Sequence, residues 1–147
     1  MAATPEQIEH VRQLFVEAVP EVAAGTVELV GIGMEPGVLA MVVVRSKAES
    51  VDPLGACIGH RGHTIKQMVP KLKCPITVIR WSDPIKDLIM NVLGPVEIKW
   101  LEVDPEARRA SVYIAKPHPA LDTRENNLRA NVLSEITGYS VSISEYF

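Results

Sequence analysis

Two segments with helical patterns meet at Gly55-Ala-Cys-Ile-Gly59-His-Arg-Gly62-His-Thr-Ile65-Lys66, where a Gly-x-x-Gly turn separates them. No Asp or Glu occurs in residues 53–82, although the whole chain has a formal net charge of -3. The basic residues of this window are Arg61, Lys66, Lys71, Lys73 and Arg80. A glycine-rich bend with local positive charge in an acidic chain predicts a clamp for a phosphate backbone.

The turn has the residue types that contact with single-stranded RNA requires. Glycine at 59 and 62 removes Cβ atoms, so a sugar-phosphate chain can lie against the peptide. A helix from about His63 would point N–H groups and its positive dipole end at that chain. Bases would lie on an apolar groove beside a strand over residues 76–79. The predicted RNA-binding residues are Ile58, Gly59, His60, Arg61, Gly62, Ile65, Lys66 and Val78.

A purely structural interpretation of the turn is the alternative. Gly59 and Gly62 can serve only to form a tight corner between two helices. The chain has nine glycines, so one such spacing also arises readily by chance. The turn alone therefore does not establish RNA contact.

Hydrophobic periodicity predicts an α+β fold around the turn. Thr4-Pro5-Glu6-Gln7 has the form of a capping box at the start of a helix that ends at Pro20. β-Branched residues then predict two paired strands. Over residues 1–81 the predicted order is helix, strand, strand, helix, helix, strand. The strands are predicted over 26–32, 39–44 and 75–81, and Asp52-Pro53 opens the second of the three helices.

The same pattern starts again near Ser82. Ser82 or Asp83 is the predicted cap of a helix that ends at Gly94-Pro95. Further along, we predict strands over 96–103, 110–114 and 139–143 and a helix over 126–136. The chain therefore consists of two α+β units of about 70 residues, joined near Trp81, with a weak internal repeat.

Several segments extend the pattern to a known family. They are Pro20 to Leu29, Glu35-Pro36-Gly37, Val51-Asp-Pro-Leu-Gly-Ala-Cys57, Arg80-Trp-Ser-Asp-Pro84 and Ile136-Thr-Gly138. Together with the Gly-x-x-Gly turn, they resemble the tandem KH region of the NusA family of transcription elongation and termination factors. The resemblance covers almost the whole chain. It implies two prokaryotic-type (type II) KH domains, each α-β-β-α-α-β with a three-stranded sheet: residues 1–81 with an intact turn and 82–147 with a degenerate one.

The chain departs from the family pattern in two ways. No glycine lies between Gly94 and Gly138, and Asp122-Thr-Arg124-Glu125 occupies the place of the second turn. Acids there would repel phosphate, so a solvated helix start is the main interpretation. A second RNA contact through Arg124, Asn126, Asn127 and Arg129 is the alternative. The N-terminal polymerase-binding domain and the OB-fold domain of the bacterial factors are also not in this sequence, which is more similar to the short archaeal relatives.

The resemblance implies a single-stranded RNA-binding protein that acts on nascent transcripts, in elongation, pausing, termination or antitermination. One alternative target is ribosomal RNA during ribosome assembly. The other alternative is a protein-interaction module that docks on RNA polymerase. KH chemistry is the same for both RNA targets, so the sequence does not separate them.

Other functional classes lack support in the sequence. Cys57, His60, His63 and Cys74 have a spacing of no standard zinc site, so we expect buried, reduced thiols and no metal. No phosphate-binding loop, Gly-x-Ser-x-Gly or His-Glu-x-x-His motif occurs, and we expect neither an enzyme nor a cofactor. No targeting segment or membrane-length apolar run is present, which predicts a cytoplasmic protein. Trp81 and Trp100 are expected in the core or at a domain interface.

Overall fold

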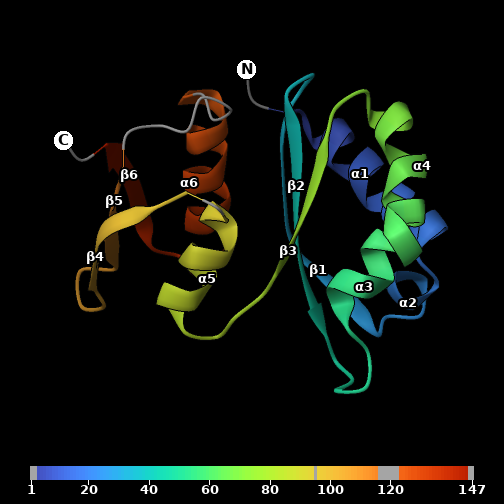
Figure 1. Ribbon diagram of the computed structural model, residues 1–147, viewed down its shortest axis with the longest axis horizontal. Coiled ribbons are helices and arrows are strands. Elements are labelled where there is room, and N and C mark those ends of the chain that lie inside the picture. The colour runs from blue at the N-terminus through green and yellow to red at the C-terminus, as the bar shows by residue number, and fades with distance from the viewer. Residues whose placement is uncertain (1–2, 95, 116–122, 146–147) are drawn as a thin grey trace. The chain divides into compact units, whose positions relative to one another are not determined.

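Two three-stranded mixed sheets, each with its own helices, organise the part of the chain that the computed structural model describes, residues 3–94, 96–115 and 123–145 (Figure 1). The chain divides into two compact units, residues 1–81 and 82–147. The predicted α+β class is confirmed. None of the helices in these ranges is both long and apolar enough to cross a membrane.

The first unit begins with the predicted capping box. α1 (Pro5–Ala18) starts after Thr4, whose hydroxyl accepts from the Gln7 N–H at 3.2 Å. The Gln7 side chain in turn accepts from the Thr4 N–H at 2.9 Å. A short α2 (Pro20–Ala23) follows, and the apolar stripe of α1 buries Val11 and Phe15 against the sheet.

The sheet of the first unit has the order β1-β2-β3. β1 (Val27–Glu35) pairs antiparallel with β2 (Leu39–Ser46), and β3 (Ile76–Arg80) pairs parallel with β2. β2 is the central strand, and its residues 39–44 are all buried. β3 therefore forms one edge of this sheet, which is where the predicted groove would lie.

Two helices on either side of the glycine turn cover the sheet. α3 (Pro53–Ile58) starts at Asp52, whose carboxylate accepts from the Leu54 N–H at 3.1 Å. α4 (His63–Leu72) follows one tight 3-10 turn at His60–Gly62. Figure 1 shows α1, α3 and α4 on the same face of the sheet. Cys57 and Met68 are buried there against β2 residues such as Val42.

The second unit repeats this plan with fewer described elements. Its order is α5 (Ile85–Leu93), β4 (Ile98–Asp104), β5 (Arg109–Ile114), α6 (Thr123–Thr137) and β6 (Ser140–Glu145). β4 pairs antiparallel with β5, and β5 pairs parallel with β6. The expected α-β-β-α-α-β order needs one more helix between β5 and β6. That position falls on residues 116–122, which lie outside the described part of the chain.

Two local expectations for the second unit are contradicted, namely the side-chain cap of α5 and a core position for Trp100. The N-cap of α5 is Pro84 and no side chain caps the helix, so neither Ser82 nor Asp83 has that role. Trp100 is 59 % exposed and so is not a core residue. Trp100 pairs across the strands with Tyr113, and successive side chains of a strand point to opposite faces of the sheet. Trp100 therefore lies on one face, whereas the buried side chains of Ala110 and Val112 lie on the other.

Candidate nucleic-acid interface

The turn between α3 and α4 depends on left-handed backbone conformations. Gly59 ends α3 with φ +81° and ψ 170°, and Gly62 precedes α4 with φ +75°. Arg61 also has a positive φ, 54°. Side chains with a Cβ rarely adopt such angles, because the Cβ crowds the backbone. The turn therefore requires glycine at both ends, and Arg61 is held in a costly conformation between them.

The two glycines differ in what surrounds them. A Cβ at Gly59 would lie 2.8 Å from both the Cβ and the backbone nitrogen of Thr64, which is too close. A Cβ at Gly62 would meet nothing nearer than Lys66 Cε at 3.7 Å. Gly59 thus serves the internal packing of the corner, as the structural interpretation of the turn supposes. The surface at Gly62 is open, so a ligand backbone can approach it.

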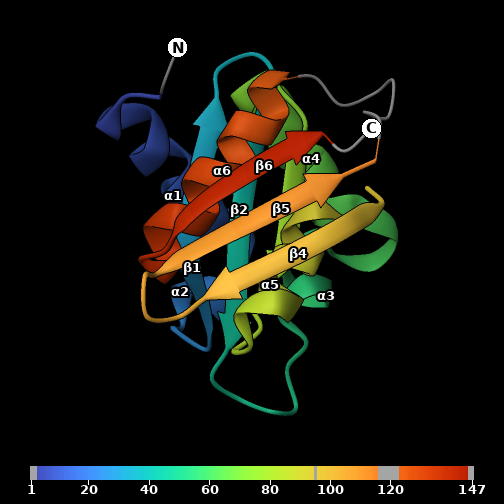
Figure 2. The same ribbon diagram turned by 90° about the vertical axis from the view of Figure 1, so that its left-hand side faces the viewer.

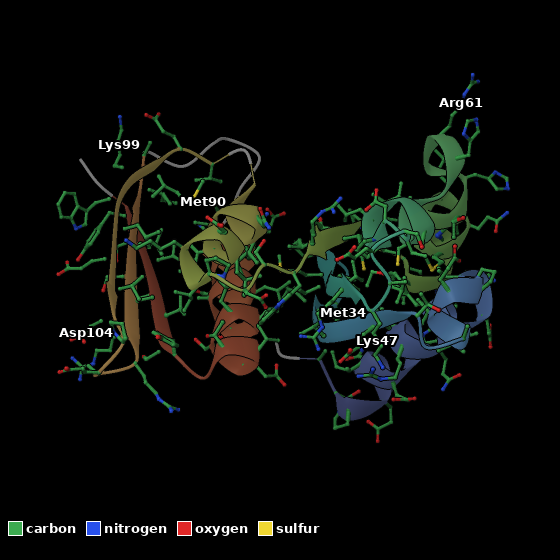
Figure 3. All side chains as sticks on the ribbon, turned by 90° about the horizontal axis from the view of Figure 1, so that it is seen from below. Met34, Lys47, Arg61, Met90, Lys99 and Asp104 are labelled. Carbon is green, nitrogen blue, oxygen red and sulfur yellow. The ribbon has the colours of Figure 1, made fainter. Side chains whose placement is uncertain are left out.

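Positive and donor side chains surround this open surface. His60, Arg61, His63, Thr64 and Lys66 line a shallow hollow of about 440 Å³. The side chain of Arg61 extends away from the ribbon at the end of the first unit (Figure 3). His60, Arg61 and Lys66 are exposed. The hollow brings together three of the predicted contacts and adds His63 and Thr64, which sequence reasoning did not include.

The start of α4 adds a favourable dipole to the hollow. No side chain caps this helix end, whose N-cap is Gly62. An uncapped N-terminus carries a partial positive charge and favours an anion near its first turn. His63 is the first residue of α4, and its ring Nε2 lies 3.0 Å from Gln67 Nε2. The protein thus places a helix dipole and the two cationic side chains Arg61 and Lys66 around one opening.

The apolar residues predicted to line a groove come from three elements, Ile58 from α3, Ile65 from α4 and Val78 from the edge strand β3, and none of them lines the hollow at the turn. Ile58, Ile65 and Val78 are all partly exposed. Ile65 and Val78 also pack with their inner surfaces against the core of the first unit. β3 pairs with β2, and no other described strand pairs with its outer side. Its backbone groups on that side can therefore contact the edges of bases.

A half-exposed ion pair links the start of α3 to the end of β3. Arg80 Nη2, at the end of β3, lies 2.8 Å from Asp52 Oδ1, at the start of α3. The same carboxylate oxygen caps α3 by accepting from Leu54 N. The pairing of Arg80 with Asp52 was not predicted from the sequence, in which Arg80 is a positive charge near the turn and the first residue of the segment Arg80-Trp-Ser-Asp-Pro84. The Asp52-Pro53 helix start could have indicated this ion pair, because the carboxylate of a capping Asp also attracts a nearby cation.

Arg129 is not placed to bind RNA as a free cation. It is 7 % exposed, its Nε donates to Val92 O at 3.3 Å, and its Nη1 lies 3.7 Å from Glu125 Oε2. The burial of Arg129 gives no support to the alternative of an RNA contact through this residue, and it also departs from a fully solvated helix start. The position of Arg129 on α6 turns its side chain toward Val92 on α5, which its charge alone does not indicate. Arg124 belongs to α6, and its side chain is outside the described part of the structure.

The two predicted asparagines lie in a second hollow between α6 and β6. Asn126 and Asn127 line a space of about 420 Å³ together with Asn131 and Ser142. The Oδ1 atom of Asn126 is buried and accepts no hydrogen bond within the described residues. Asn131, one turn further along α6, was not predicted. Its distance of four residues from Asn127 would have indicated Asn131, because residues four apart lie on the same face of a helix.

Both cysteines are buried and unlinked. Burial, with a smaller contribution from the negative charge of Glu21, raises the pKa of Cys57 to about 11. Burial also raises the pKa of Cys74, although a hydrogen bond from the Gly37 backbone works in the opposite direction. No group of three His, Cys, Asp or Glu side chains within the described ranges is arranged to hold a metal ion.

Comparison with known proteins places these features in a family. The family model described as "NusA-like first KH domain" matches residues 5–81. The transcription termination/antitermination protein NusA of Thermus thermophilus is 37 % identical over 139 residues, 94 % of this chain and 35 % of that protein. The protein of the same name from Bacillus subtilis is 29 % identical over 90 % of this chain and 36 % of its own length. The chain therefore spans about a third of the relatives that it matches.

A solved structure shows the same fold. The crystal structure of APE1850 matches 97 % of this chain and 100 % of that chain, with a TM-score of 0.63. The sequences are 17 % identical, so this likeness concerns the fold alone.

Proposed function

The chain belongs to the family of proteins with a NusA-like first KH domain, and we propose that it binds single-stranded RNA at the turn His60–Gly62. The observation that carries the proposal is the open backbone surface at Gly62, which adjoins the uncapped start of α4 and the hollow lined by Arg61 and Lys66. A tight corner alone accounts for Gly59. It does not account for exposed cationic side chains around an opening.

We assign separate roles to the two sides of the groove. Phosphates lie against Gly62 and the first turn of α4, where Arg61 and Lys66 neutralise their charge. Bases lie across Ile58, Ile65 and Val78, and the outer side of β3 contacts their edges. A KH clamp of this kind holds about four nucleotides. Partly exposed apolar side chains suit stacked or flat bases because burying them on binding is favourable.

The two units correspond, in this proposal, to tandem type II KH domains over residues 1–81 and 82–147. The second domain has Asp122 to Glu125 in place of the glycine turn. Its contribution to RNA binding then rests on the hollow between α6 and β6, where Asn126, Asn127 and Asn131 offer amide groups to base edges. Side-chain amides can hydrogen-bond to bases but do not neutralise phosphate charge. The contact through these asparagines therefore adds to the binding at the glycine turn of the first unit and does not replace it.

The proposed target is the nascent transcript. The relatives carry the name transcription termination/antitermination protein, which supports a role in elongation, pausing, termination or antitermination. RNA polymerase is the protein partner that this role implies. Sequencing of RNA crosslinked to the protein in cells tests the target: transcripts from many genes support the proposal, whereas a predominance of ribosomal RNA identifies ribosome assembly as the function instead.

A charge reversal at the turn tests the clamp. The probe is a randomised single-stranded RNA of about twelve nucleotides, roughly three KH footprints in length. His60→Asp with Arg61→Asp should abolish measurable binding in fluorescence anisotropy while circular dichroism stays unchanged. Lys47→Asp with Ser50→Asp changes the net charge equally, at two exposed residues of a loop that begins well away from Arg61 (Figure 3). The control variant should keep at least half of the affinity. Equal affinity of both double variants would refute the clamp.

A further inference from the structure

Exposed apolar surface gathers at one edge of the second unit. Met90 on α5 is 53 % exposed and Trp100 on β4 is 59 % exposed, and they are the exposed large hydrophobic side chains of the described residues. Both line one open groove of about 610 Å³, with Ile98 and Leu101 in its wall. Figure 3 shows Met90 on α5 and Lys99 on β4, which also line it. A groove that concentrates the exposed apolar side chains of a domain is typical of an interaction site.

The groove runs along an unpaired strand edge. β4 is at the end of the sheet order β4-β5-β6, as Figure 2 shows, and its outer side has no partner strand within the described ranges. The pairing with β5 shifts between Ile98 and Trp100, so Lys99 forms a bulge. From Trp100 to Asp104 the register is regular. Unpaired N–H and C=O groups along a regular segment form a template for one more strand.

The two faces of this segment differ in character. Val103 lies opposite the buried Ala110, so Val103 and Leu101 belong to the helix-covered face. Trp100, Glu102 and Asp104 alternate with them and lie on the open face. Glu102 and Asp104 are exposed, and neither has an ion-pair partner within residues 3–94, 96–115 and 123–145.

The charge that β4 itself carries beyond Trp100 is acidic, because its exposed side chains there are Glu102 and Asp104. Around them, residues 94–109 also contain the acids Glu97 and Glu106 and the basic residues Lys99, Arg108 and Arg109, and Arg109 on β5 lies across from Asp104. Lys99 is already paired, since its Nζ lies 2.9 Å from Glu97 Oε1. An added strand would therefore meet Glu102 and Asp104 on β4, which favour basic side chains opposite them and disfavour acidic ones.

We propose that the β4 edge, Trp100 to Asp104, binds a short, extended, basic segment of a partner protein by strand addition. The backbone of the segment completes the ladder on the outer side of β4. Its basic side chains lie opposite Glu102 and Asp104, and its apolar side chains lie beside Leu101 and Val103. The groove at Met90 receives an apolar residue at one end of the segment. This site lies in a different unit from the RNA clamp and does not depend on it.

Charge also argues against a second copy of this chain as the occupant. Pairing of β4 with its own copy would bring two acidic edges together, and directly opposed like charges destabilise a strand pair. A bulge and charged residues are the usual means by which an edge avoids such self-pairing. A basic partner removes this repulsion, which makes it the occupant that fits the surface.

A pair of synthetic peptides tests the proposal. The probe peptide is acetyl-Lys-Val-Lys-Val-Lys-Val-Lys-amide, and its twin has Glu in place of each Lys. The protein is the full chain with Trp81→Phe, which leaves Trp100 as its only tryptophan. The basic peptide should shift the Trp100 emission saturably to the blue and slow amide exchange in β4. The acidic twin should do neither.

A charge-reversal variant supplies the decisive comparison. Glu102→Lys with Asp104→Lys should lower the affinity for the basic peptide by about tenfold and raise the affinity for the acidic twin. Glu17→Lys with Glu49→Lys makes the same change of charge at exposed positions of the first unit and should leave both affinities unchanged. Equal effects of the two variants, or no binding of the basic peptide, overturn the proposal. Two further results also overturn it: a dimer in sedimentation that Trp100→Ala abolishes, or RNA binding that requires Trp100 but not Arg61.

Discussion

At the scale of single residues, the two glycines of the turn have separable functions. Gly59 is needed for packing against Thr64, whereas the Cβ of any residue at 62 would lie on the open side. The sequence shows both only as Gly-x-x-Gly, so it cannot tell the packing glycine from the binding one. The difference comes from the distance between residues 59 and 64, which depends on how the 3-10 turn closes.

Alanine substitutions should separate these functions. Gly59→Ala adds a close contact to an unfavourable φ and should destabilise the protein by about 2–4 kcal/mol. Gly62→Ala adds only the left-handed strain, about 1 kcal/mol, but its Cβ occupies the proposed phosphate path. Urea unfolding and RNA anisotropy together measure both effects. If Gly62→Ala keeps wild-type affinity, the ligand backbone does not approach residue 62.

Burial of Cys57 should make stability fall at high pH. Burial raises the pKa of the folded Cys57 thiol from its ordinary value of 9.0 to about 11, so the folded state holds this proton to a higher pH than the unfolded state does. Stability is then unaffected below about pH 9 and decreases between about pH 9 and 11. Urea midpoints across that range should decrease less steeply for Cys57→Ala than for the wild type. Parallel slopes, or rapid labelling of the native Cys57 thiol at neutral pH, would contradict this.

At the scale of elements, the position of α3 beside β3 defines one side of the proposed RNA groove. Asp52 has two tasks, the cap of α3 and the ion pair with Arg80. Asn can still cap a helix, whereas Ala cannot. The two tasks can therefore be distinguished by substitution.

Two variants of Asp52 measure the cap and the ion pair. The pair is half-exposed, so Asp52→Asn should lower the free energy of unfolding by only about 0.5 kcal/mol. Asp52→Ala also loses the cap and should cost about 1.5 kcal/mol in total. Chemical denaturation gives both values. Equal losses in the free energy of unfolding for Asp52→Asn and Asp52→Ala would contradict a capping role of Asp52.

Local rules predicted most elements, and tertiary context explains the failures. The capping box at Thr4, the turn at Gly59 and the strand pairs follow from residues close in sequence, and the structure contains them. Arg129 was misjudged because its burial depends on the packing of α6 against α5, which no local pattern encodes. Exposure of Trp100 likewise depends on which face of a finished sheet the helices cover.

At the scale of the whole molecule, binding of a polyanion by a chain with a net charge of -3 must rely on local charge. The clamp offers Arg61, Lys66 and the start of α4, which correspond to about three phosphates. For single strands, the logarithm of the affinity should then fall against the logarithm of salt concentration with a slope near -2. A few contacts of this kind give weak, salt-sensitive binding.

The salt dependence should identify Lys66 as a phosphate contact. Lys66→Gln should reduce the magnitude of the slope by about 0.7, the value of one contact. Lys47→Gln removes the same charge from an exposed residue far from the turn and should leave the slope unchanged. Anisotropy titrations at several salt concentrations supply the slopes. If Lys47→Gln reduced the magnitude of the slope more than Lys66→Gln does, RNA would bind along another surface.

The location of bound RNA on the whole chain is measured most directly by amide chemical shifts. Titration of the isotope-labelled protein with the randomised RNA should perturb the amides of residues 59–66 and of β3 first and most strongly. Smaller shifts should follow in α6 around Asn127 and Asn131. Shifts confined to the second unit, with residues 59–66 unchanged at saturation, would contradict the assignment of the glycine turn as the RNA clamp.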